Sequence, residues 1–306
     1  MKVPEVFAKW TVDREGAEGQ AWLDELPGIV EDLLGQWGLQ RDGDVLHGQV
    51  GVVVPVAGDA VLKVSFPHPG NVHEPDAFAA WDGRGAVKLY ERDDARYAML
   101  LERAHTTTLV EHTDGVATIA GDLLRQLTIP APDGLPRMSD KADDWAEELR
   151  KDASELDHPL PDRVVQQAMA VVEELCRTQP ETVVHGDFHP RNILRADREP
   201  WLVVDPKGYV GDPAFDAGIF LRTRAYHLLL GDGLAVDDLL RYLQTELEQF
   251  AEASGVDADR IRRWTQLIAV QASFWGRRNG FGRARGGSEL DRVITLIDQV
   301  AIAWGE

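Results

Sequence analysis

The hydrophobic pattern of this chain changes its period once, and that change restricts the folds open to it. Residues 44–64 and 86–104 contain short runs rich in valine and leucine, separated by glycine-containing turns, which is typical of β-strands. From about residue 116, apolar residues recur every three or four positions, as in amphipathic helices. Within this helical part, residues 182–204 again contain two β-like segments around a loop. We therefore expect an α+β fold with a small β-rich lobe and a larger, mainly helical lobe.

The same change of period places the boundary between the two lobes near residue 103. We expect residues 1–102 to form the N-terminal lobe and residues 103–306 to form the C-terminal lobe. A chain of 306 residues is long enough for two lobes with a cleft between them, and small ligands usually bind in such clefts.

Composition and charge exclude several classes of function. The formal net charge of −20 repels the phosphates of nucleic acids and anionic lipids, and it attracts small cations. The single cysteine, Cys176, cannot form an intrachain disulfide, and the charged N-terminus does not resemble a signal peptide. No apolar run approaches the roughly 20 residues of a membrane helix. We therefore expect a cytoplasmic protein that binds neither nucleic acid nor membrane, with its oligomeric state left open.

The segment Val183–Leu194, "VVHGDFHPRNIL", admits two chemical interpretations. On a regular strand, His185, Asp187 and His189 would share one face and could hold a metal ion, as in a metallohydrolase. However, the glycine and proline inside the segment favour a loop, and structural zinc sites usually have four ligands. The metallohydrolase therefore remains an alternative.

The second interpretation is phosphoryl transfer, which requires an oriented acceptor hydroxyl, a bound Mg²⁺ and phosphates held in line. Asn192 follows Asp187 by five residues, and Asp205 follows it by eighteen. Protein kinases place a catalytic aspartate, a metal-binding asparagine and a second metal-binding aspartate in this order. The spacing therefore favours a kinase that uses ATP and Mg²⁺.

The stretch "HGDFHPRNIL…WLVVDPKGYVGDPAFDAG" resembles the aminoglycoside phosphotransferase family, and in particular its branch of streptomycin and hydroxyurea antibiotic resistance kinases. The resemblance covers roughly residues 44–220 and becomes weak in the C-terminal third. It implies a protein-kinase-like fold with two lobes and ATP-dependent phosphorylation of a small, cationic, hydroxylated acceptor. A streptomycin-type aminoglycoside is the acceptor that it favours.

The resemblance also assigns roles to the residues of this region. Asp187 would be the catalytic base, and Asn192 and Asp205 would be the magnesium ligands. His185 would support the catalytic loop, and Asp216 would accept hydrogen bonds from the backbone amides of that loop.

On the nucleotide side, Lys63 in "AVLKV" would contact the phosphates, and Glu74 would orient Lys63. A competing role is open for Glu74, because "NVHE" has the form of a capping pattern with Asn71 as the N-cap. Pro75 also disfavours helical geometry at the residue before it.

Two further parts of the N-terminal lobe are candidates for nucleotide contacts. Gly48 and Gly51 in "LHGQVG" would let a turn lie close over the phosphates, although two glycines alone are also typical of a hairpin. By resemblance, backbone groups of Glu102 and Ala104 would hydrogen-bond the adenine, and Leu101 would lie beside the ring.

Residues that recognise the acceptor are harder to predict. The acidic run at residues 139–157 is typical of a solvated helix face. We expect Trp275 to be a core residue at the end of an apolar helix, with stacking on a sugar ring as the alternative. A local basic patch near it, which would disfavour a cationic ligand or would balance acidic helices, consists of Arg277, Arg278, Arg283 and Arg285.

Two other functions remain open at this point. A metabolic kinase of an amino sugar or of another hydroxylated amine would share these motifs, because fold and motif do not name the acceptor. A non-catalytic, nucleotide-binding member of the same fold is the other possibility.

Overall fold

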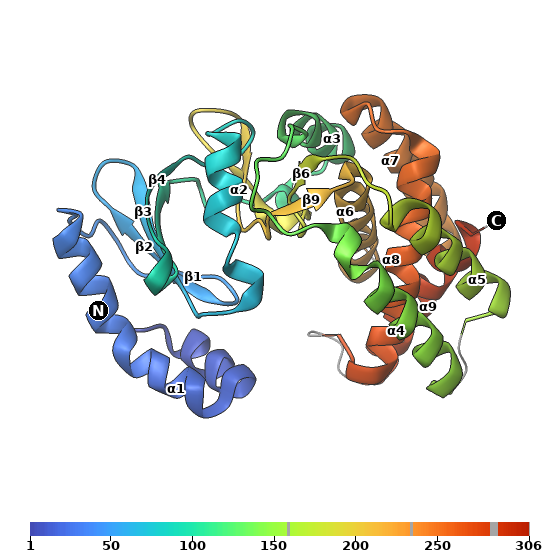
Figure 1. Cartoon of the computed structure of the whole chain (residues 1–306), viewed down its shortest axis with the longest axis horizontal. Helices are drawn as coiled ribbons and strands as arrows, with labels where there is room; N and C mark the ends of the chain where they lie inside the picture. Colours follow the sequence, from blue (N-terminus) through green and yellow to red (C-terminus); the bar gives the residue numbers. More distant parts are fainter. Residues whose placement is uncertain (158–159, 233–234, 282–286, 306) are drawn as a thin grey trace.

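The polypeptide folds into a small lobe built on a β-sheet and a larger helical lobe (Figure 1). The computed structural model describes residues 1–157, 160–232, 235–281 and 287–305. The N-terminal third of the chain, blue in Figure 1, forms the first lobe, and the remainder forms the second. The predicted α+β class is therefore confirmed.

The main sheet has the strand order β1-β2-β3-β5-β4, with all neighbours antiparallel. Two short two-stranded sheets, β6 with β9 and β7 with β8, lie in the helical lobe. The strands are β1 (Leu46–His47), β2 (Gly51–Val56), β3 (Ala60–Ser65), β4 (Leu89–Asp93), β5 (Ala98–Glu102), β6 (Thr182–Val184), β7 (Ile193–Arg195), β8 (Trp201–Val203) and β9 (Tyr209–Gly211).

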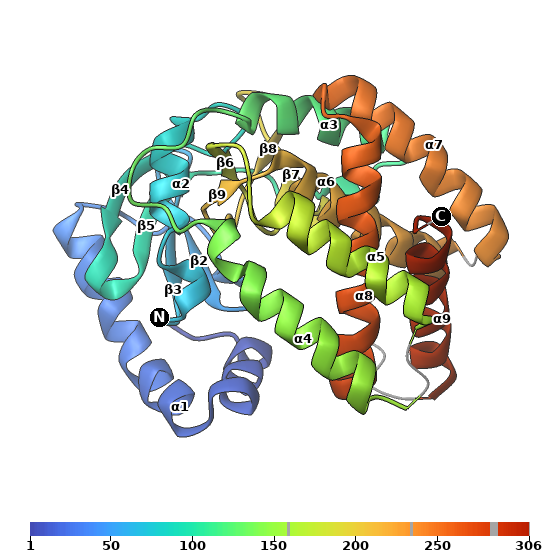
Figure 2. The ribbon, with the colours of Figure 1, turned by 45° about the vertical axis from the view of Figure 1, so that its right-hand side comes forward.

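Helices cover the main sheet and make up most of the second lobe. Figure 2 shows α4, α5 and α8 side by side in that lobe, and α9 at its edge. The helices are α1 (Glu5–Gln36), α2 (Glu74–Trp81), α3 (Val116–Leu127), α4 (Ala142–Glu155), α5 (Asp162–Val171), α6 (Pro213–His227), α7 (Val236–Ser254), α8 (Ala258–Asn279) and α9 (Gly287–Ala303). Among the described residues, no helix is long and apolar enough to cross a bilayer.

The alternation of side chains along β3 fixes which residues face α1 and which face away from it. Leu62 and Val64 pack with the buried face of α1 in one hydrophobic cluster. Because successive side chains of a strand point to opposite faces, Lys63 faces the other way, between the cross-strand neighbours Val53 and Met99. The valine-rich sheet thus places one lysine on the side away from α1.

The two lobes are joined by backbone pairing as well as by the chain itself. Val203 in β8 exchanges hydrogen bonds with the segment before β4, through Gly85 and Val87. Arg195 in β7 pairs in the same way with the segment after β5. The β7–β8 hairpin of the helical lobe therefore holds both ends of the β4–β5 hairpin. The division into residues 1–102 and 103–306 remains our proposal, which the end of β5 at Glu102 supports.

Close packing of α3 on α7 gives a test of this arrangement. Gly121→Ala places a Cβ 2.7 Å from the carbonyl oxygen of Phe250 and 2.8 Å from the Cβ of Ala253. We expect it to lower the free energy of unfolding by about 1–3 kcal/mol, because a packed interface must open to admit it. Gly28→Ala in α1 is the matched control, since nothing lies within 4 Å of its added Cβ. It should raise that free energy by about 0.5–1 kcal/mol. Urea denaturation measures both, and equal midpoints for Gly121→Ala and wild type would contradict the packing.

Candidate active site

A buried ion-pair network joins the two lobes. The ammonium group of Lys63 contacts the carboxylates of Glu74 and Asp205, and the Nζ–Oε1 distance to Glu74 is 2.5 Å. Lys63 and Glu74 are 7% and 2% exposed, so neither group has an alternative partner in bulk water. Burial by itself lowers the pKa of Lys63, but the charges of Asp205 and Glu74 raise it above its ordinary value. Lys63 is therefore charged.

Glu74 pairs with Lys63 and begins α2, so it does not cap this helix from outside. Asn71 donates its side-chain amide to the carbonyl of Phe66, and the N-cap position belongs to His73. Pro75 occupies the first turn of α2, where a missing N–H costs nothing. The expected conflict between capping and pairing is therefore absent.

Asp205 lies where the two lobes meet, and its carboxylate is half-exposed. Its backbone has a φ of 59°, an unusual conformation for a residue with a side chain. Burial acts to raise the pKa of Asp205, but the adjacent Lys63 outweighs burial and holds this pKa below its ordinary value. The turn between β1 and β2 lies directly above it, because a Cβ built on Gly48 would be 3.9 Å from Oδ2 of Asp205. Gly51 makes its own close approach to the backbone of β3 instead.

The loop after β6, which is called the catalytic loop after its predicted role, is held by one carboxylate from α6. Asp216, in the first turn of α6, accepts hydrogen bonds from the backbone N–H groups of His185 (2.7 Å) and Gly186 (2.9 Å). Burial raises the pKa of Asp216 to about 7, against the opposing effect of these two bonds. Gly186 has a φ of 81°, and a Cβ there would be 2.8 Å from the ring of Tyr209. Only glycine fits at this point of the loop.

His185 supports the loop through hydrogen bonds of its neutral ring. Its Nδ1 accepts the backbone N–H of Asp187 at 3.2 Å, and its Nε2–H donates to the carbonyl of Val204 at 3.0 Å. The ring is fully buried and stacks on Trp81. Burial lowers the pKa of His185 to about 4, so the ring is neutral at pH 7. Because both ring nitrogens are engaged within the protein, His185 is not placed to ligate a metal.

Asp187 stands at the tip of the loop, partly open to solvent. Asn192 donates its side-chain amide to the backbone carbonyl of Asp187 at 3.0 Å and approaches Oδ2 of Asp187 at 3.5 Å. His189 lies on the other side, with Nε2 3.5 Å from Oδ1 of Asp187. Its Nδ1 is buried without a hydrogen-bond partner among the described residues.

The predicted metal-binding residues suit magnesium better than zinc. The described residues contain no group of three or more His, Cys, Asp or Glu side chains that could hold a metal ion by themselves. Mg²⁺ is usually bound by one or two carboxylates together with substrate phosphates and water. Asn192 uses its NH₂ group toward Asp187, which leaves its oxygen available, and Asp205 supplies a half-exposed carboxylate. These oxygen donors fit Mg²⁺.

The segment that connects the lobes contains the three residues predicted to surround adenine. Leu101 is buried in the larger hydrophobic cluster, and Ala104 packs against the same cluster. Glu102 donates its backbone N–H to the carbonyl of Lys88, so this N–H is not free to bind a base. The side chain of Glu102 forms an ion pair with Arg198, at 2.9 Å. Sequence reasoning did not find Arg198, whose only signal was its place in a turn.

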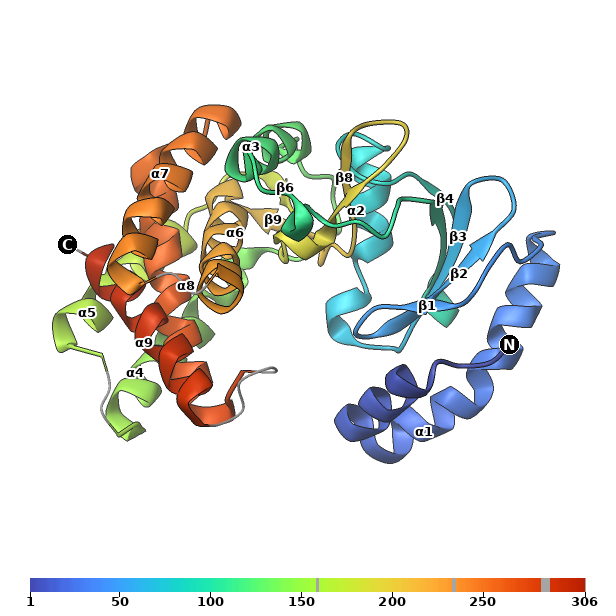
Figure 3. The same cartoon turned by 180° about the vertical axis from the view of Figure 1, so that it is seen from behind.

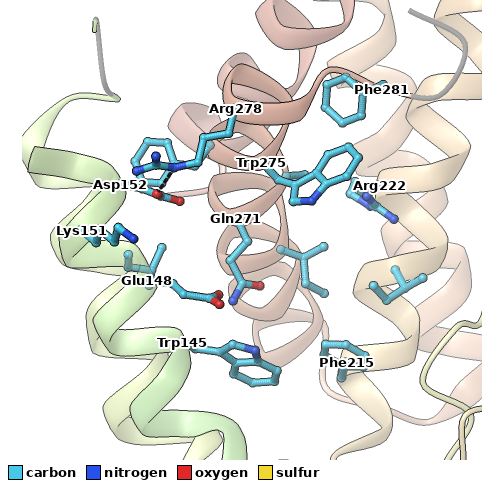
Figure 4. A pocket seen from close by; sticks show the side chains of 15 residues that line it. Trp145, Glu148, Lys151, Asp152, Phe215, Arg222, Gln271, Trp275, Arg278 and Phe281 are labelled. Carbon is cyan, nitrogen blue, oxygen red and sulfur yellow. Dashed lines mark hydrogen bonds and ion pairs between the residues drawn. The ribbon is translucent and has the colours of Figure 1, made fainter. Parts of the chain in front are cut away.

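A pocket of about 690 Å³ opens among α4, α6 and α8 (Figure 4). Trp145 and Glu148 line it from α4, Phe215 and Arg222 from α6, and Gln271 from α8. The rings of Trp145 and Phe215 are parallel, with an interplanar angle of 8°, and Figure 4 shows the Glu148 carboxylate near the Gln271 amide. The volume lies within the roughly 300–1,000 Å³ typical of ligand sites.

This pocket lies beside the catalytic loop. Phe215 precedes Asp216, which holds the loop, and both belong to the first turn of α6. Burial lowers the pKa of His189, and the nearby positive charge of Arg222 lowers it further. Arg222, which lines the pocket, is therefore close to the histidine that flanks Asp187.

Two expectations about the acceptor region change here. Trp275 is 52% exposed and lines the pocket, so the prediction of a core tryptophan was wrong. The acidic run of residues 139–157 is not only a solvated face, because Trp145 and Glu148 in it line the pocket.

The two described arginines of the basic patch balance acidic side chains of neighbouring helices, as one alternative predicted. Arg277 pairs with Asp298 at 2.6 Å, and Arg278 pairs with Asp152 and Glu155. Arg283 and Arg285 lie outside the described residues.

Comparison with known proteins agrees with this geometry. The model of the family described as aminoglycoside/hydroxyurea antibiotic resistance kinase matches residues 36–280. The chain is 33% identical over 288 residues to a streptomycin 6-kinase of Streptomyces glaucescens, covering 92% of each chain. It is 31% identical over 290 residues to a hydroxyurea phosphotransferase of Kitasatospora aureofaciens, covering 92% of this chain and 82% of that protein.

Solved structures share the fold at lower identity. The choline kinase LicA from Streptococcus pneumoniae superposes with a TM-score of 0.55 at 13% identity, covering 91% of this chain and 99% of the other. A GDP complex of an aminoglycoside 2'-phosphotransferase superposes with a TM-score of 0.53 at 14% identity, covering 90% and 98%. The fold is thus that of small-molecule kinases with two lobes.

The buried, neutral His185 makes stability depend on pH. The unfolded chain protonates this histidine near pH 6.5, but the folded protein does so only near pH 4. The unfolded state therefore binds more protons between these values, and His185 destabilises the fold as pH falls from 6.5 to 4. His185→Asn keeps an acceptor for the Asp187 N–H and should flatten this part of the pH profile by up to about 3 kcal/mol. Urea unfolding between pH 7 and pH 4.5 measures this pH dependence of the free energy of unfolding, with His68→Asn as the surface control. Parallel profiles for His185→Asn and wild type would contradict the assignment.

Proposed function

The chain belongs to the aminoglycoside/hydroxyurea antibiotic resistance kinase family, and on this basis we propose that it transfers the γ-phosphoryl group of ATP to a hydroxyl group of a cationic, streptomycin-type acceptor. Phosphorylation of such an antibiotic would confer resistance. The amino sugars and other hydroxylated amines remain the alternative acceptors.

One observation supports this proposal: residues that are distant in sequence meet where the two lobes join. Lys63 from the sheet lobe contacts Asp205 from the helical lobe, 142 residues later. Asp187 and Asn192 are hydrogen-bonded to each other beside them. A buried lysine would orient the donor phosphates, and a carboxylate at a loop tip would receive the acceptor.

The chemistry proposed for the site balances without a covalent intermediate. Asp187 hydrogen-bonds the acceptor hydroxyl and takes its proton as the hydroxyl oxygen bonds to the γ-phosphorus. The bond from that phosphorus to the β–γ bridging oxygen breaks, which releases ADP and a phosphate ester. Asn192 and Asp205 would hold Mg²⁺, and the metal when bound offsets the charge of the phosphate oxygens.

The pocket beside the loop is the proposed acceptor site. Trp145, Phe215 and Trp275 provide flat faces that suit a sugar ring or a guanidinium group, and cations bind favourably over aromatic faces. Glu148 has no ion-pair partner among the described residues and would pair with a cationic group of the acceptor. Among the relatives, streptomycin 6-kinases of two Streptomyces species and a streptomycin 3''-kinase of Klebsiella pneumoniae support a guanidinium-bearing acceptor.

The first test of the function uses Asp187→Asn. We expect this variant to lose at least about a hundredfold in kcat, because general base catalysis contributes this much or more. Its affinity for Mg-ATP should stay near that of wild type, since Asp187 faces the acceptor. ADP release is measured with streptomycin, kanamycin, hydroxyurea, glucosamine and a fructosamine. Turnover with streptomycin names the acceptor class, turnover with glucosamine or the fructosamine alone supports a metabolic kinase, and full activity of Asp187→Asn would reject the assigned base.

The second test concerns the acceptor pocket. Glu148→Gln should raise KM for the accepted substrate about fivefold, the loss of one partly exposed ion pair, with kcat little changed. Glu147→Gln is the matched control, because this exposed neighbour on α4 carries the same charge but does not line the pocket. Equal KM values for the two variants would place the acceptor elsewhere.

A further inference from the structure

The first part of α1 is folded back against the turn that lies above Asp205. The helix bends at Gly16, whose φ of 63° and ψ of −133° are not helical, and Figure 3 shows the bent ribbon beside β1 and β2. Its two parts touch closely, because a Cβ on Gly19 would be 2.8 Å from the carbonyl oxygen of Thr11. Phe7 is fully buried and packs edge-on against Trp22. The segment before Gly16 is therefore a fixed part of the lobe.

This segment contacts the β1–β2 turn at three points. The rings of Phe7 and Trp10 lie 5.6 Å and 5.8 Å from the ring of His47, at the end of β1. Arg14 donates from Nη1 to the backbone carbonyl of Gln49 at 2.9 Å, inside the turn itself. Phe7, Trp10 and Arg14 precede residue 36, where the match to the family model begins.

The bond from Arg14 fixes the orientation of one peptide group in the turn. The carbonyl of Gln49 and the N–H of Val50 belong to the same planar trans peptide and point in opposite directions. The N–H of Gly48 is used within the turn, by the carbonyl of Gly51. Within the part of the chain that the structure describes, the N–H groups of Gln49 and Val50 have no protein partner. Holding the Gln49 carbonyl toward α1 thus aims the N–H of Val50 away from α1.

We propose that Arg14 is a positioning residue for the nucleotide: by holding the Gln49 carbonyl, it presents the N–H of Val50 to the phosphates of ATP. The inference rests on the proposed nucleotide site between this turn, Lys63 and Asp205. Backbone N–H groups in a glycine-containing turn bind phosphate oxygens well, and a turn oriented in advance loses less entropy on binding. Arg14 acts through the turn and need not touch the nucleotide.

The test compares Arg14→Ala with Lys9→Ala in the full-length chain. Lys9 is an exposed residue of the same segment and makes no hydrogen bond or ion pair with the turn among the described residues, so its loss removes the same charge. We expect the Kd for Mg-ATP, measured by calorimetry without acceptor, to rise about tenfold in Arg14→Ala, the effect of one charged hydrogen bond. The Kd of Lys9→Ala should stay within about twofold of the wild-type value, because isolated surface charges contribute little. The Kd of Arg14→Lys, which keeps a hydrogen-bond donor, should lie between the Kd values of the other two variants.

A purely structural role for Arg14 would not raise the KM for ATP alone. At saturating ATP, Arg14→Ala should keep the kcat of wild type and its KM for the acceptor, and only the KM for ATP should rise. A Kd no higher than that of Lys9→Ala, with an unchanged Tm, would overturn the inference. Lys63→Met separates the two proposals: if it loses Mg-ATP binding while Arg14→Ala does not, the nucleotide site stands and the role of Arg14 fails. If wild type does not bind Mg-ATP, the proposed function fails.

Discussion

The ammonium group of Lys63 is the point on which the arrangement of the two lobes depends. A buried, unpaired charge costs several kcal/mol, so Lys63 requires a carboxylate nearby in the folded protein. The sheet lobe supplies Glu74 from α2, and the helical lobe supplies Asp205. Because one cation pairs with carboxylates from both lobes, the relative position of the lobes and the ionisation of Lys63 are coupled. A ligand that competes for Lys63 also changes what holds the lobes together.

Helix α6 connects the loop that contains Asp187 with the pocket proposed for the acceptor. Residues three or four apart lie on one face of a helix, and Phe215, Ile219 and Arg222 follow this spacing along the pocket. Asp216, one position after Phe215, points instead to the backbone of the catalytic loop. Asp212 caps the same helix and holds the indole N–H of Trp264 at 2.6 Å. A shift of α6 would therefore move the catalytic loop and the pocket wall together.

The sequence allowed prediction of the elements and residues that depend on local periodicity and short spacing. It did not reveal contacts between segments that are distant along the chain. The helical pattern expected from about residue 116 begins at that residue, with α3 (Val116–Leu127), and the loop between β6 and β7 contains the expected Asp187 and Asn192. Helix α1 was not predicted, because its glycines and Pro27 obscure the helical pattern, and Gly16 interrupts it. The ion pair of Arg198 spans 96 residues, so no local pattern reveals it. Trp275 looked apolar in sequence, but one face of α8 lines a pocket.

Charge acts on two length scales in this protein. The formal net charge of −20 attracts a cationic acceptor over long distances, but it also repels ATP, which is an anion. Binding of a nucleotide must therefore depend on groups within a few ångströms, where a dry, ordered environment strengthens electrostatic interactions. Lys63 provides one such charge on the floor of the cleft, and the turn above Asp205 provides backbone N–H groups that carry no net charge. An acidic protein can bind both an anionic donor and a cationic acceptor in one cleft only if its attraction for the donor is short-ranged and oriented in advance.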